Sequence, residues 1–382
     1  MACLPRRDGS VKITDRLSRL GQLILQICCL CALGTAVPVV MLSQTSPQGR
    51  RYVGAYFFGG WWKDRPDQLG ALTAPPFLER EPLNGWFLSG AALRSEATSA
   101  AALGLDFFAI DWYYGTSEAP QLEARQLNRA LDYYLDSIAN VPVALALLWA
   151  NHPPFAVRAK DWPGVVDSLV VKFSKHPDAW FKPDRKIVLI VFDPPGLRSG
   201  LAPLSVRVAL DTLRHAVRRR SGIDLAVGAA LNTVLSRDQR ALRAAQEDGY
   251  DFLTSYHYNF LHGERAVAPF ADLLDSSAMM WRRLRSWGGL SLVPAAAVGW
   301  DPQPWRGVDT TSRYLPWTRE DATRLGASLR DLVPPCDSAP SLRCTALLYA
   351  WNEFGEGGYL LPTRGDPTGA RTRALVAAFK NQ

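Results

Sequence analysis

Two glutamates three positions apart are the residues of this sequence best suited to acid–base chemistry. They lie in LLYAWNEFGEGGYLLPT, residues 347–363, where an apolar run ends at Asn352 and a glycine-rich bend carries Glu353 and Glu356. Cleavage of a glycosidic bond needs two carboxyl groups, one that protonates the departing oxygen and one that acts as base or nucleophile. Aromatic neighbours can desolvate one carboxyl group and raise its pKa toward that of a general acid. We therefore interpret Glu353 and Glu356 as candidate catalytic residues of a glycosidase.

Metal and serine-nucleophile chemistry are not indicated by the sequence. Its five histidines are scattered, with no H-E-x-x-H motif and no Cys/His cluster of metal-site spacing. A G-x-S-x-G nucleophile elbow is also missing from the sequence. We expect the protein to use no metal and no other cofactor.

The elements that must position the two glutamates alternate along the chain. Nearly continuous apolar runs, typical of parallel strands covered on both faces, are separated by stretches whose apolar residues lie three to four apart. The predicted strands are 52–58, 105–115, 141–151, 186–193, 224–231, 251–258, 290–300 and 344–353. The predicted helices lie near 95–103, 121–138, 163–175, 203–219, 236–246, 267–287, 319–332 and 368–379. This alternation predicts an α/β fold, a single (β/α)8 TIM barrel over 52–382. An open doubly wound sheet is the alternative, but the sequence has no glycine-rich phosphate loop after its first predicted strand.

Sites of such barrels form at the carboxyl ends of the strands, where this sequence collects aromatic and polar residues. Trp and Tyr stack against the C–H faces of pyranose rings, and Asn, Asp and His hydrogen-bond hydroxyl groups, so we expect a sugar-binding cleft. The predicted substrate-binding residues are Tyr56, Trp61, Trp62, Asp111, Trp112, Tyr113, Trp149, Asn151, His152, Tyr256, His257, Tyr258, Trp300, Asp301, Asn352 and Tyr359. For His152 and His257 we favour hydrogen bonding to a substrate hydroxyl over acid–base catalysis. For Asp111 we favour holding a hydroxyl or orienting a loop over a role as a third catalytic carboxylate.

The first 42 residues are distinct from the barrel. Basic residues precede the apolar run LGQLILQICCLCALGTAVPVVML at 20–42, and no charged residue occurs between Arg19 and Arg50. We interpret 1–42 as a signal peptide or a signal-anchor and 43–51 as a linker. Either alternative places the catalytic domain outside the cytoplasm, as a membrane-anchored protein or as a secreted or periplasmic one.

The charge distribution argues against a nucleic-acid partner. Residues 1–51 supply +5 of the formal net charge of +7, so the remaining chain is close to neutral. The predicted partners are an oligo- or polysaccharide substrate and, through the N-terminal segment only, a membrane.

Two cysteines remain outside the first 42 residues, Cys336 and Cys344. They flank a short loop rich in proline and serine, and exported proteins keep such pairs oxidised. We predict a disulfide bond between them.

The segment around the two glutamates resembles a known catalytic signature. YAWNEFGEGGYLLPT (349–363) is similar to the W-N-E-x-x-E-G motif of glycoside hydrolase family 99 and of the related WbsX-like proteins. VGWDPQPWRG (298–307) is similar to a motif of the latter, and GLDFFAIDWYYG and LLWAN resemble their second and third strands. The resemblance extends over residues 52–382.

This resemblance implies a (β/α)8 fold and retaining, metal-independent cleavage of α-linked glycans, typically mannosides. It also implies that Glu356 is the general acid/base and that Glu353 is the base that assists the substrate's own 2-hydroxyl. Phe354 and Gly355 stand where family 99 usually has Trp and His, and NEFGEG also resembles the N-D-Y-G-E-S motif of family 71, the α-1,3-glucanases. The sugar, the linkage and the stereochemical outcome therefore stay open.

Two other functions remain alternatives. A glycosyltransferase-like protein of polysaccharide biosynthesis would use the same cleft, but no diphosphate-binding loop and no D-x-D motif is evident. A catalytically silent carbohydrate-binding barrel would keep the aromatic residues without requiring both Glu353 and Glu356. We therefore expect a glycoside hydrolase that acts on α-mannosides or α-glucans.

Overall fold

A computed structural model describes residues 49–137, 141–232, 234–257, 267–306 and 312–380. All of them belong to the unit Pro47–Gln382. The predicted signal segment 1–42, most of the linker 43–51 and the site candidate Tyr258 lie outside the described residues. Within the described ranges, no helix is both long enough and apolar enough to cross a membrane.

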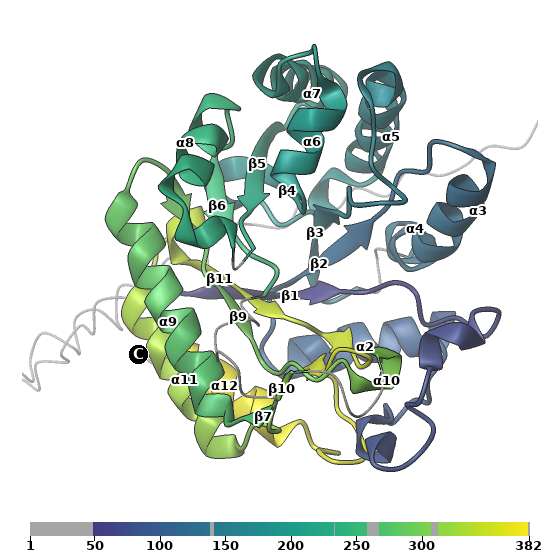
Figure 1. Ribbon diagram of the computed structural model, residues 1–382, viewed down its shortest axis with the longest axis vertical. Helices are drawn as coiled ribbons and strands as arrows, with labels where there is room; N and C mark the ends of the chain where they lie inside the picture. The colour runs from purple at the N-terminus through teal and green to yellow at the C-terminus, as the bar shows by residue number, and fades with distance from the viewer. Residues whose placement is uncertain (1–48, 138–140, 233, 258–266, 307–311, 381–382) are drawn as a thin grey trace, which may run out of the picture. The chain divides into compact units, whose positions relative to one another are not determined.

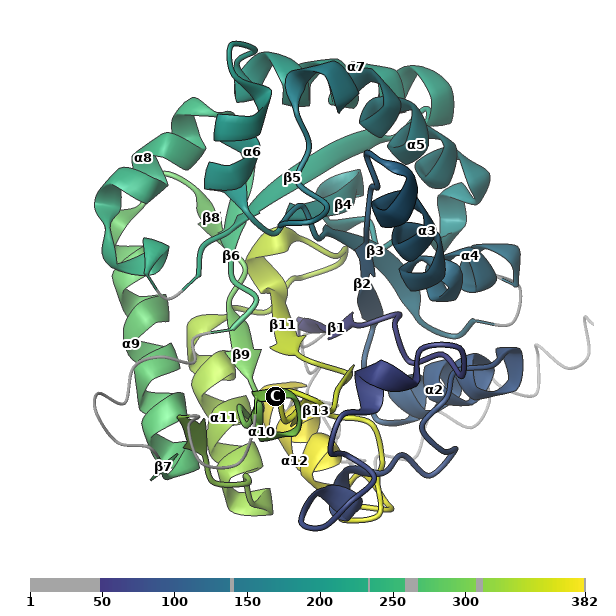
Figure 2. The same ribbon diagram turned by 45° about the vertical axis from the view of Figure 1, so that its right-hand side comes forward.

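A parallel sheet of nine strands, in the order β8-β6-β5-β4-β3-β2-β1-β11-β9, forms the centre of this unit. The strands are β1 Tyr52–Phe57, β2 Phe107–Trp112, β3 Ala144–Trp149, β4 Lys186–Val191, β5 Asp224–Ala230, β6 Phe252–Thr254, β8 Ser291–Leu292, β9 Ala295–Ala297 and β11 Thr345–Tyr349. Figures 1 and 2 show the sheet curled on itself with helices outside it. Side chains pack on both faces of the sheet, so the strands are almost wholly buried and apolar. This burial explains why the strands appear in the sequence as continuous apolar runs.

One predicted strand, 290–300, is divided into β8 and β9 by Val293 and Pro294. Pro294 has no N–H to donate to a sheet ladder, so regular pairing stops there. β8 pairs with β6 and β9 pairs with β11. In the gap, the N–H of Val293 donates to the carbonyl of Leu253 at 2.9 Å, and the N–H of Leu347 donates to the carbonyl of Pro294 at 2.9 Å. This run joins the two sides of the sheet and confirms an α/β, TIM-barrel-like fold.

Helices follow most strands and cover the outer face of the sheet (Figures 1 and 2). They are α2 Gly90–Ala102, α3 Glu118–Leu127, α4 Arg129–Asp136, α5 Trp162–Lys175, α6 Pro194–Leu201, α7 Val206–Ser221, α8 Gln239–Glu247, α9 Phe270–Trp287, α10 Gln303–Arg306, α11 Arg319–Leu332 and α12 Ala370–Lys380. Helix α6 was not predicted, although Pro194 starts it and the carboxylate of Asp193 caps it by accepting from the N–H of Gly196 at 3.0 Å.

The predicted helix 121–138 is two helices that meet at Asn128. The side chain of Asn128 accepts from the N–H of Tyr113 at 2.9 Å and donates to its carbonyl at 2.8 Å. These two bonds join the junction of α3 and α4 to the backbone just after β2, where the candidate site begins.

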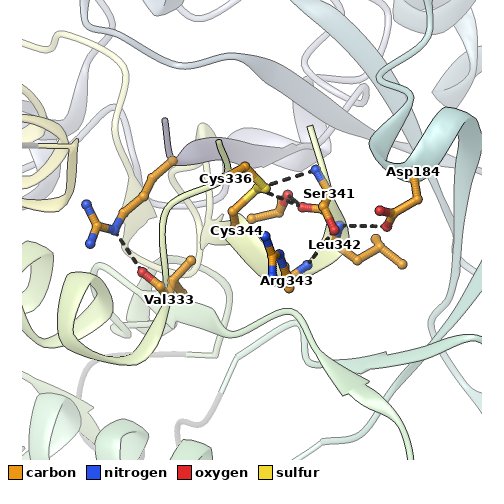
Figure 3. The surroundings of a disulfide bond; sticks show 9 residues. Asp184, Val333, Cys336, Ser341, Leu342, Arg343 and Cys344 are labelled. Atoms are coloured by element: carbon orange, nitrogen blue, oxygen red, sulfur yellow. Dashed lines mark hydrogen bonds between the residues drawn. A yellow bond between two sulfur atoms is a disulfide. The ribbon is translucent and has the colours of Figure 1, made fainter. Parts of the chain in front are cut away.

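Cys336 and Cys344 form the predicted disulfide, with their Cα atoms 5.6 Å apart (Figure 3). The backbone of Cys336 also exchanges two hydrogen bonds with Arg50, at 2.8 and 2.9 Å. The N–H of Leu342, inside the loop, donates to the carboxylate of Asp184 at 3.0 Å. These contacts hold the amino-terminal ends of β1 and β11, the ends opposite to the two glutamates.

Candidate active site

A cavity of about 430 Å³ lies at the carboxyl ends of the strands, a size typical of small-molecule sites. Loops that follow β1, β2, β3, β4, β6 and β9 contribute to its wall, together with the bend after β11. It is lined by Phe58, Arg65, Asp111, Tyr113, Glu123, Leu127, Leu148, Ala150, His152, Pro154, Phe155, Phe192, Tyr256, His257, Trp305, Glu353 and Glu356. Carboxyl groups and aromatic rings dominate this lining, and the combination suits a polyol with apolar C–H faces.

The two glutamates lie on one hairpin. Strand β12 (Asn352–Glu353) pairs antiparallel with β13 (Gly358–Tyr359), so Glu353 and Glu356 lie at the start and within the turn between them. The N–H of Glu356 donates to the carbonyl of Glu353 at 3.3 Å. The turn passes through Gly357 with φ of 77°, a left-handed conformation that favours glycine. The glycine-rich sequence thus allows both carboxyl groups to line one cavity.

A buried arginine from the long loop after β1 fixes this hairpin. Arg80, at the end of the 3-10 helix η2 (Phe77–Arg80), donates to the carbonyls of Phe354 at 2.8 Å and Asp301 at 3.0 Å. The Arg80 guanidinium also forms an ion pair with the carboxylate of Asp301. The backbone N–H of Asp301 in turn donates to the carbonyl of Glu356 at 2.6 Å. Asp301, a predicted substrate-binding residue, therefore positions the bend and does not line the cavity.

Each catalytic candidate accepts a hydrogen bond from one tyrosine. The hydroxyl of Tyr256 donates to Oε1 of Glu353 at 2.8 Å, and the hydroxyl of Tyr349 donates to Oε2 of Glu356. The ring of Tyr349 approaches Gly358 so closely that a Cβ atom there would lie 2.5 Å from a ring carbon. The glycine is therefore needed for the tyrosine to reach its glutamate.

A third carboxyl group, that of Asp111, lies beside this pair. Its Oδ2 accepts from the hydroxyl of Tyr113 at 3.4 Å. Oδ1 of Asp111 and Oε2 of Glu353 are buried and have no hydrogen-bond partner among the described residues. Buried acceptors of this kind are costly unless a donor reaches them, so they mark places where ligand hydroxyl groups can bind.

Burial raises the pKa of Glu353 well above its ordinary range, and the charges of Glu356 and Asp111 raise it further, while the bond from Tyr256 lowers it. Burial also raises the pKa of Glu356, against the opposing effect of the bond from Tyr349. The pKa of Asp111 is raised well above its usual value, again mainly by burial. Carboxyl groups so placed do not all ionise together, so the set keeps a proton at pH values where exposed carboxyl groups have lost theirs.

The two predicted histidines line the cavity without forming a metal site. Burial lowers the pKa of His257 to about 4, so its imidazole is neutral at physiological pH. Nδ1 of His152 lies 2.8 Å from the carbonyl of Pro153. In the part of the chain that the structure describes, no group of three or more His, Cys, Asp or Glu side chains is arranged to hold a metal ion.

Seven predicted site residues are brought together at the cavity: Asp111, Tyr113, His152, Tyr256, His257, Glu353 and Glu356. Ten others lie outside its lining: Tyr56, Trp61, Trp62, Trp112, Trp149, Asn151, Trp300, Asp301, Asn352 and Tyr359. Trp112 and Trp149 lie in the core, with ring centroids 6.0 Å apart. Side chains alternate along a strand, so Asp111 and Tyr113 face the cavity whereas the residue between them faces outward.

Several of the remaining predicted residues stabilise the cavity wall without lining the cavity. The side-chain amide of Asn352 accepts from the N–H of Phe58 at 2.8 Å and donates to its carbonyl at 3.0 Å. Asn151 makes the same two-way contact with the backbone of Asp193, at 2.8 and 2.7 Å. The buried hydroxyl of Tyr56 donates to the carbonyl of Ser255 at 2.7 Å. These residues hold neighbouring strand ends together.

Other residues of the site were not predicted from the sequence. Phe58 ends the predicted strand 52–58, and Phe192 is the last residue but one of the predicted strand 186–193, so the strand-end pattern that identified Asp111 and Tyr113 also contained them. Arg65 and Glu123, an ion pair of 3.0 Å that lines the cavity, lie outside the strands and carry no sequence signal. Trp305 lies in the segment 298–307 that resembles a family motif, but no role was predicted for it. The loop residue Arg80 and the strand residue Tyr349 were also not predicted to take part in the site.

No protein-family model matches the sequence, and no curated protein matches it. Among solved structures, the fold is similar to that of a glycoside hydrolase-like protein, with a TM-score of 0.59 and 14% identity over 87% of this chain and 91% of that chain. It is also similar to a GH99 endo-α-mannosidase from Bacteroides thetaiotaomicron, in complex with Bis-Tris propane, with a TM-score of 0.57 and 12% identity over 86% of this chain and 97% of that chain. A second structure of that enzyme has a TM-score of 0.56 at 14% identity. These TM-scores establish a shared fold, and at identities this low they establish the fold alone. At that level they confirm the resemblance found in the sequence.

Proposed function

We propose that this protein is a glycoside hydrolase that cleaves α-linked glycans of the mannoside or glucan type, with Glu353 and Glu356 as its catalytic pair. The observation that carries the proposal is the placement of both carboxyl groups, from one hairpin, in the same cavity with raised pKa values. The aromatic lining and the fold shared with a GH99 endo-α-mannosidase support it.

In this proposal Glu356 protonates the departing glycosidic oxygen. On an α-mannoside, whose 2-hydroxyl lies trans to that oxygen, Glu353 is the base that takes the proton of the 2-hydroxyl as it attacks C1 in a retaining reaction. In the ligand-free cavity, burial and two acidic neighbours hold the pKa of Glu353 well above its ordinary range, which opposes the ionised form that a base requires. A substrate hydroxyl that donates to the free Oε2 of Glu353 would favour ionisation. Substrate binding therefore lowers the pKa of Glu353 and favours the ionised form that acts as the base.

The experiment that tests these roles is a comparison of Glu356→Gln and Glu353→Gln on two kinds of substrate, after a panel of α-mannans and α-glucans has identified a cleaved linkage. Glu356→Gln should reduce cleavage of ordinary glycosides by roughly two to four orders of magnitude, the usual contribution of a general acid. The same variant should largely retain cleavage of the matching glycosyl fluoride, whose leaving group needs little protonation. Glu353→Gln should reduce the cleavage of both substrates.

The control is Glu118→Gln, which alters an exposed glutamate in the first turn of α3 and should leave both activities unchanged. If Glu353→Gln is the variant that retains fluoride cleavage, the two roles are reversed. If both catalytic variants keep full activity, cleavage does not depend on this pair and the proposed site is wrong. If the parent protein binds a glycan of the panel but cleaves none, a catalytically silent carbohydrate-binding barrel replaces the hydrolase.

We also propose that the chain is exported, either anchored through 1–42 or released after cleavage of that segment. The disulfide between Cys336 and Cys344 supports this, because such bonds persist in oxidising compartments. Cell fractionation combined with N-terminal sequencing of the mature protein tests it. Recovery of the full-length chain in the cytoplasm would contradict it.

A further inference from the structure

The indole of Trp305 lies over the backbone between the two catalytic candidates. A Cβ atom built on Gly355 would lie 2.2 Å from Cε2 and 2.4 Å from Cζ2 of this indole. Separations below 3 Å do not occur between such atoms, so any side chain at position 355 would displace the ring. The glycine between Glu353 and Glu356 therefore makes room for a tryptophan that comes from another loop.

The backbone around Trp305 is held by the neighbouring loop. Trp305 belongs to the short helix α10, whose Pro304 carbonyl accepts from the N–H of Ala71 at 3.2 Å. The indole also stacks with Trp61, with ring centroids 6.3 Å apart and ring planes 29° apart. Trp61 is itself buried, and its indole N–H donates to the carbonyl of Asn352 at 2.9 Å. A ring supported in this way is positioned in advance for a ligand.

The indole is also accessible. The side chain of Trp305 is 39% exposed, although it lines the same cavity as the buried carboxyl groups. The faces of aromatic rings carry partial negative charge, which complements the partial positive charge of C–H bonds on a sugar ring. An exposed indole beside two carboxyl groups thus combines an apolar surface with groups that bind hydroxyls.

We propose that Trp305 is a stacking platform for a pyranose ring next to the bond that is cleaved, and that Gly355 is required because the platform lies on it. This inference rests on the proposed function and extends it by naming the residue that holds a sugar of the substrate. Trp305 acts by binding and takes no part in proton transfer, so its loss should weaken sugar binding without changing the pH dependence of catalysis.

A double-mutant cycle on the full chain tests the inference, with Trp305→Ala, Gly355→Ala and the double variant. Each is combined with Glu356→Gln, so that binding is measured without turnover, and calorimetric titration uses trisaccharides of α-linked mannose and of α-linked glucose. Trp305→Ala should weaken binding of the best trisaccharide about tenfold or more, as removal of a buried aromatic anchor does. Gly355→Ala should weaken binding similarly by displacing the ring. The double variant should bind no more weakly than Trp305→Ala alone.

Trp305→Phe, which keeps a ring, should retain most of the affinity and serves as the conservative control if the alanine variants fold poorly. In the background with Glu356 intact, Trp305→Phe should raise KM and leave the pH profile of kcat unchanged. Unaltered binding in Trp305→Ala overturns the inference, and so do additive losses from Trp305→Ala and Gly355→Ala.

These outcomes also separate the inference from the proposed function. If binding falls in Trp305→Ala but no glycan is cleaved by the intact protein, the platform stands and the hydrolase proposal fails. If cleavage depends on Glu356 but Trp305→Ala binds normally, the hydrolase proposal stands and the platform fails. Failure of the Glu356→Gln protein to bind any of the trisaccharides, with Trp305 and Gly355 intact, overturns the platform.

Discussion

The hydroxyl of Tyr256 donates a hydrogen bond to Oε1 of Glu353 at 2.8 Å, although 97 positions separate the two residues in sequence. This bond favours the ionised form of Glu353, whereas burial and the charges of Glu356 and Asp111 favour the protonated form. Tyr256 is thus the contact of Glu353 that supports its proposed role as a base. Two predictions about the pH dependence of catalysis rest on this balance.

Tyr256→Phe removes the bond and keeps the ring. The pKa of Glu353, already raised, should rise further, because the protonated form loses less from the change than the ionised form does. The base must be ionised to act, so the acidic limb of the pH profile of kcat/KM should move to higher pH. A profile that stays in place while activity falls would show that Tyr256 acts by packing alone.

Asp111→Asn should shift the same limb in the opposite direction. The negative charge of Asp111 raises the pKa of Glu353, so a neutral amide of the same shape should lower it. The acidic limb of kcat/KM should then move to lower pH, and KM should rise because a hydroxyl-binding oxygen is lost. The measurement is the pH profile of kcat/KM for Tyr256→Phe and Asp111→Asn in one buffer series. If the acidic limb moves in the same direction in both variants, the opposing effects of Tyr256 and Asp111 on Glu353 are contradicted.

Glu96 offers a prediction about stability that is separate from catalysis. It is buried, accepts a hydrogen bond from the indole N–H of Trp351 at 2.9 Å, and has its pKa raised by burial to about 8. A folded-state pKa above the unfolded value contributes stability that is complete below the unfolded pKa, near 4.5, and is lost as pH rises through 8. The free energy of unfolding should therefore fall between about pH 5 and pH 8, by an amount on the order of a few kcal/mol.

Glu96→Gln keeps an acceptor for the indole and removes the titrating group. This variant should show a flatter dependence of the free energy of unfolding on pH, and it should be more stable than the parent at pH 8. Urea unfolding of both proteins at several pH values measures the effect. Parallel curves for the two proteins would mean that Glu96 is already ionised in the folded state at pH 5.

The Cys336–Cys344 disulfide closes a short loop, with a sequence separation of 8. In the chain-entropy model such a loop contributes about 2–3 kcal/mol, so replacement of both cysteines by serine should lower the free energy of unfolding by that amount. Catalysis should be unaffected, because the bond lies at the opposite end of β11 from Glu353. Alkylation of the purified protein without reductant should modify neither cysteine, and modification of both would contradict the pairing.

The sequence by itself determined the alternation of strands and helices, the α/β class and the carboxyl-end location of the two glutamates. Strands buried on both faces must be apolar throughout, and helices on their outer side show a spacing of three to four, so both signals are local. The cysteine pair was equally local, because its two members lie close together in the chain. The break of 290–300 at Pro294 also has a local cause, because proline has no N–H to donate to a sheet ladder.

The tertiary structure alone decided which side chains share the cavity. Successive side chains of a strand point to opposite faces, but a strand that is apolar on both faces shows no alternation of polar and apolar residues in its sequence. Asp111 and Trp112 are therefore equally good candidates for the site in the sequence, although only Asp111 lines the cavity. Tyr349 reads as one more apolar strand residue until the curvature of the sheet brings its hydroxyl to Glu356. Contacts such as Trp305 on Gly355 depend on where separate loops meet, and that is set by the curvature of the sheet as a whole.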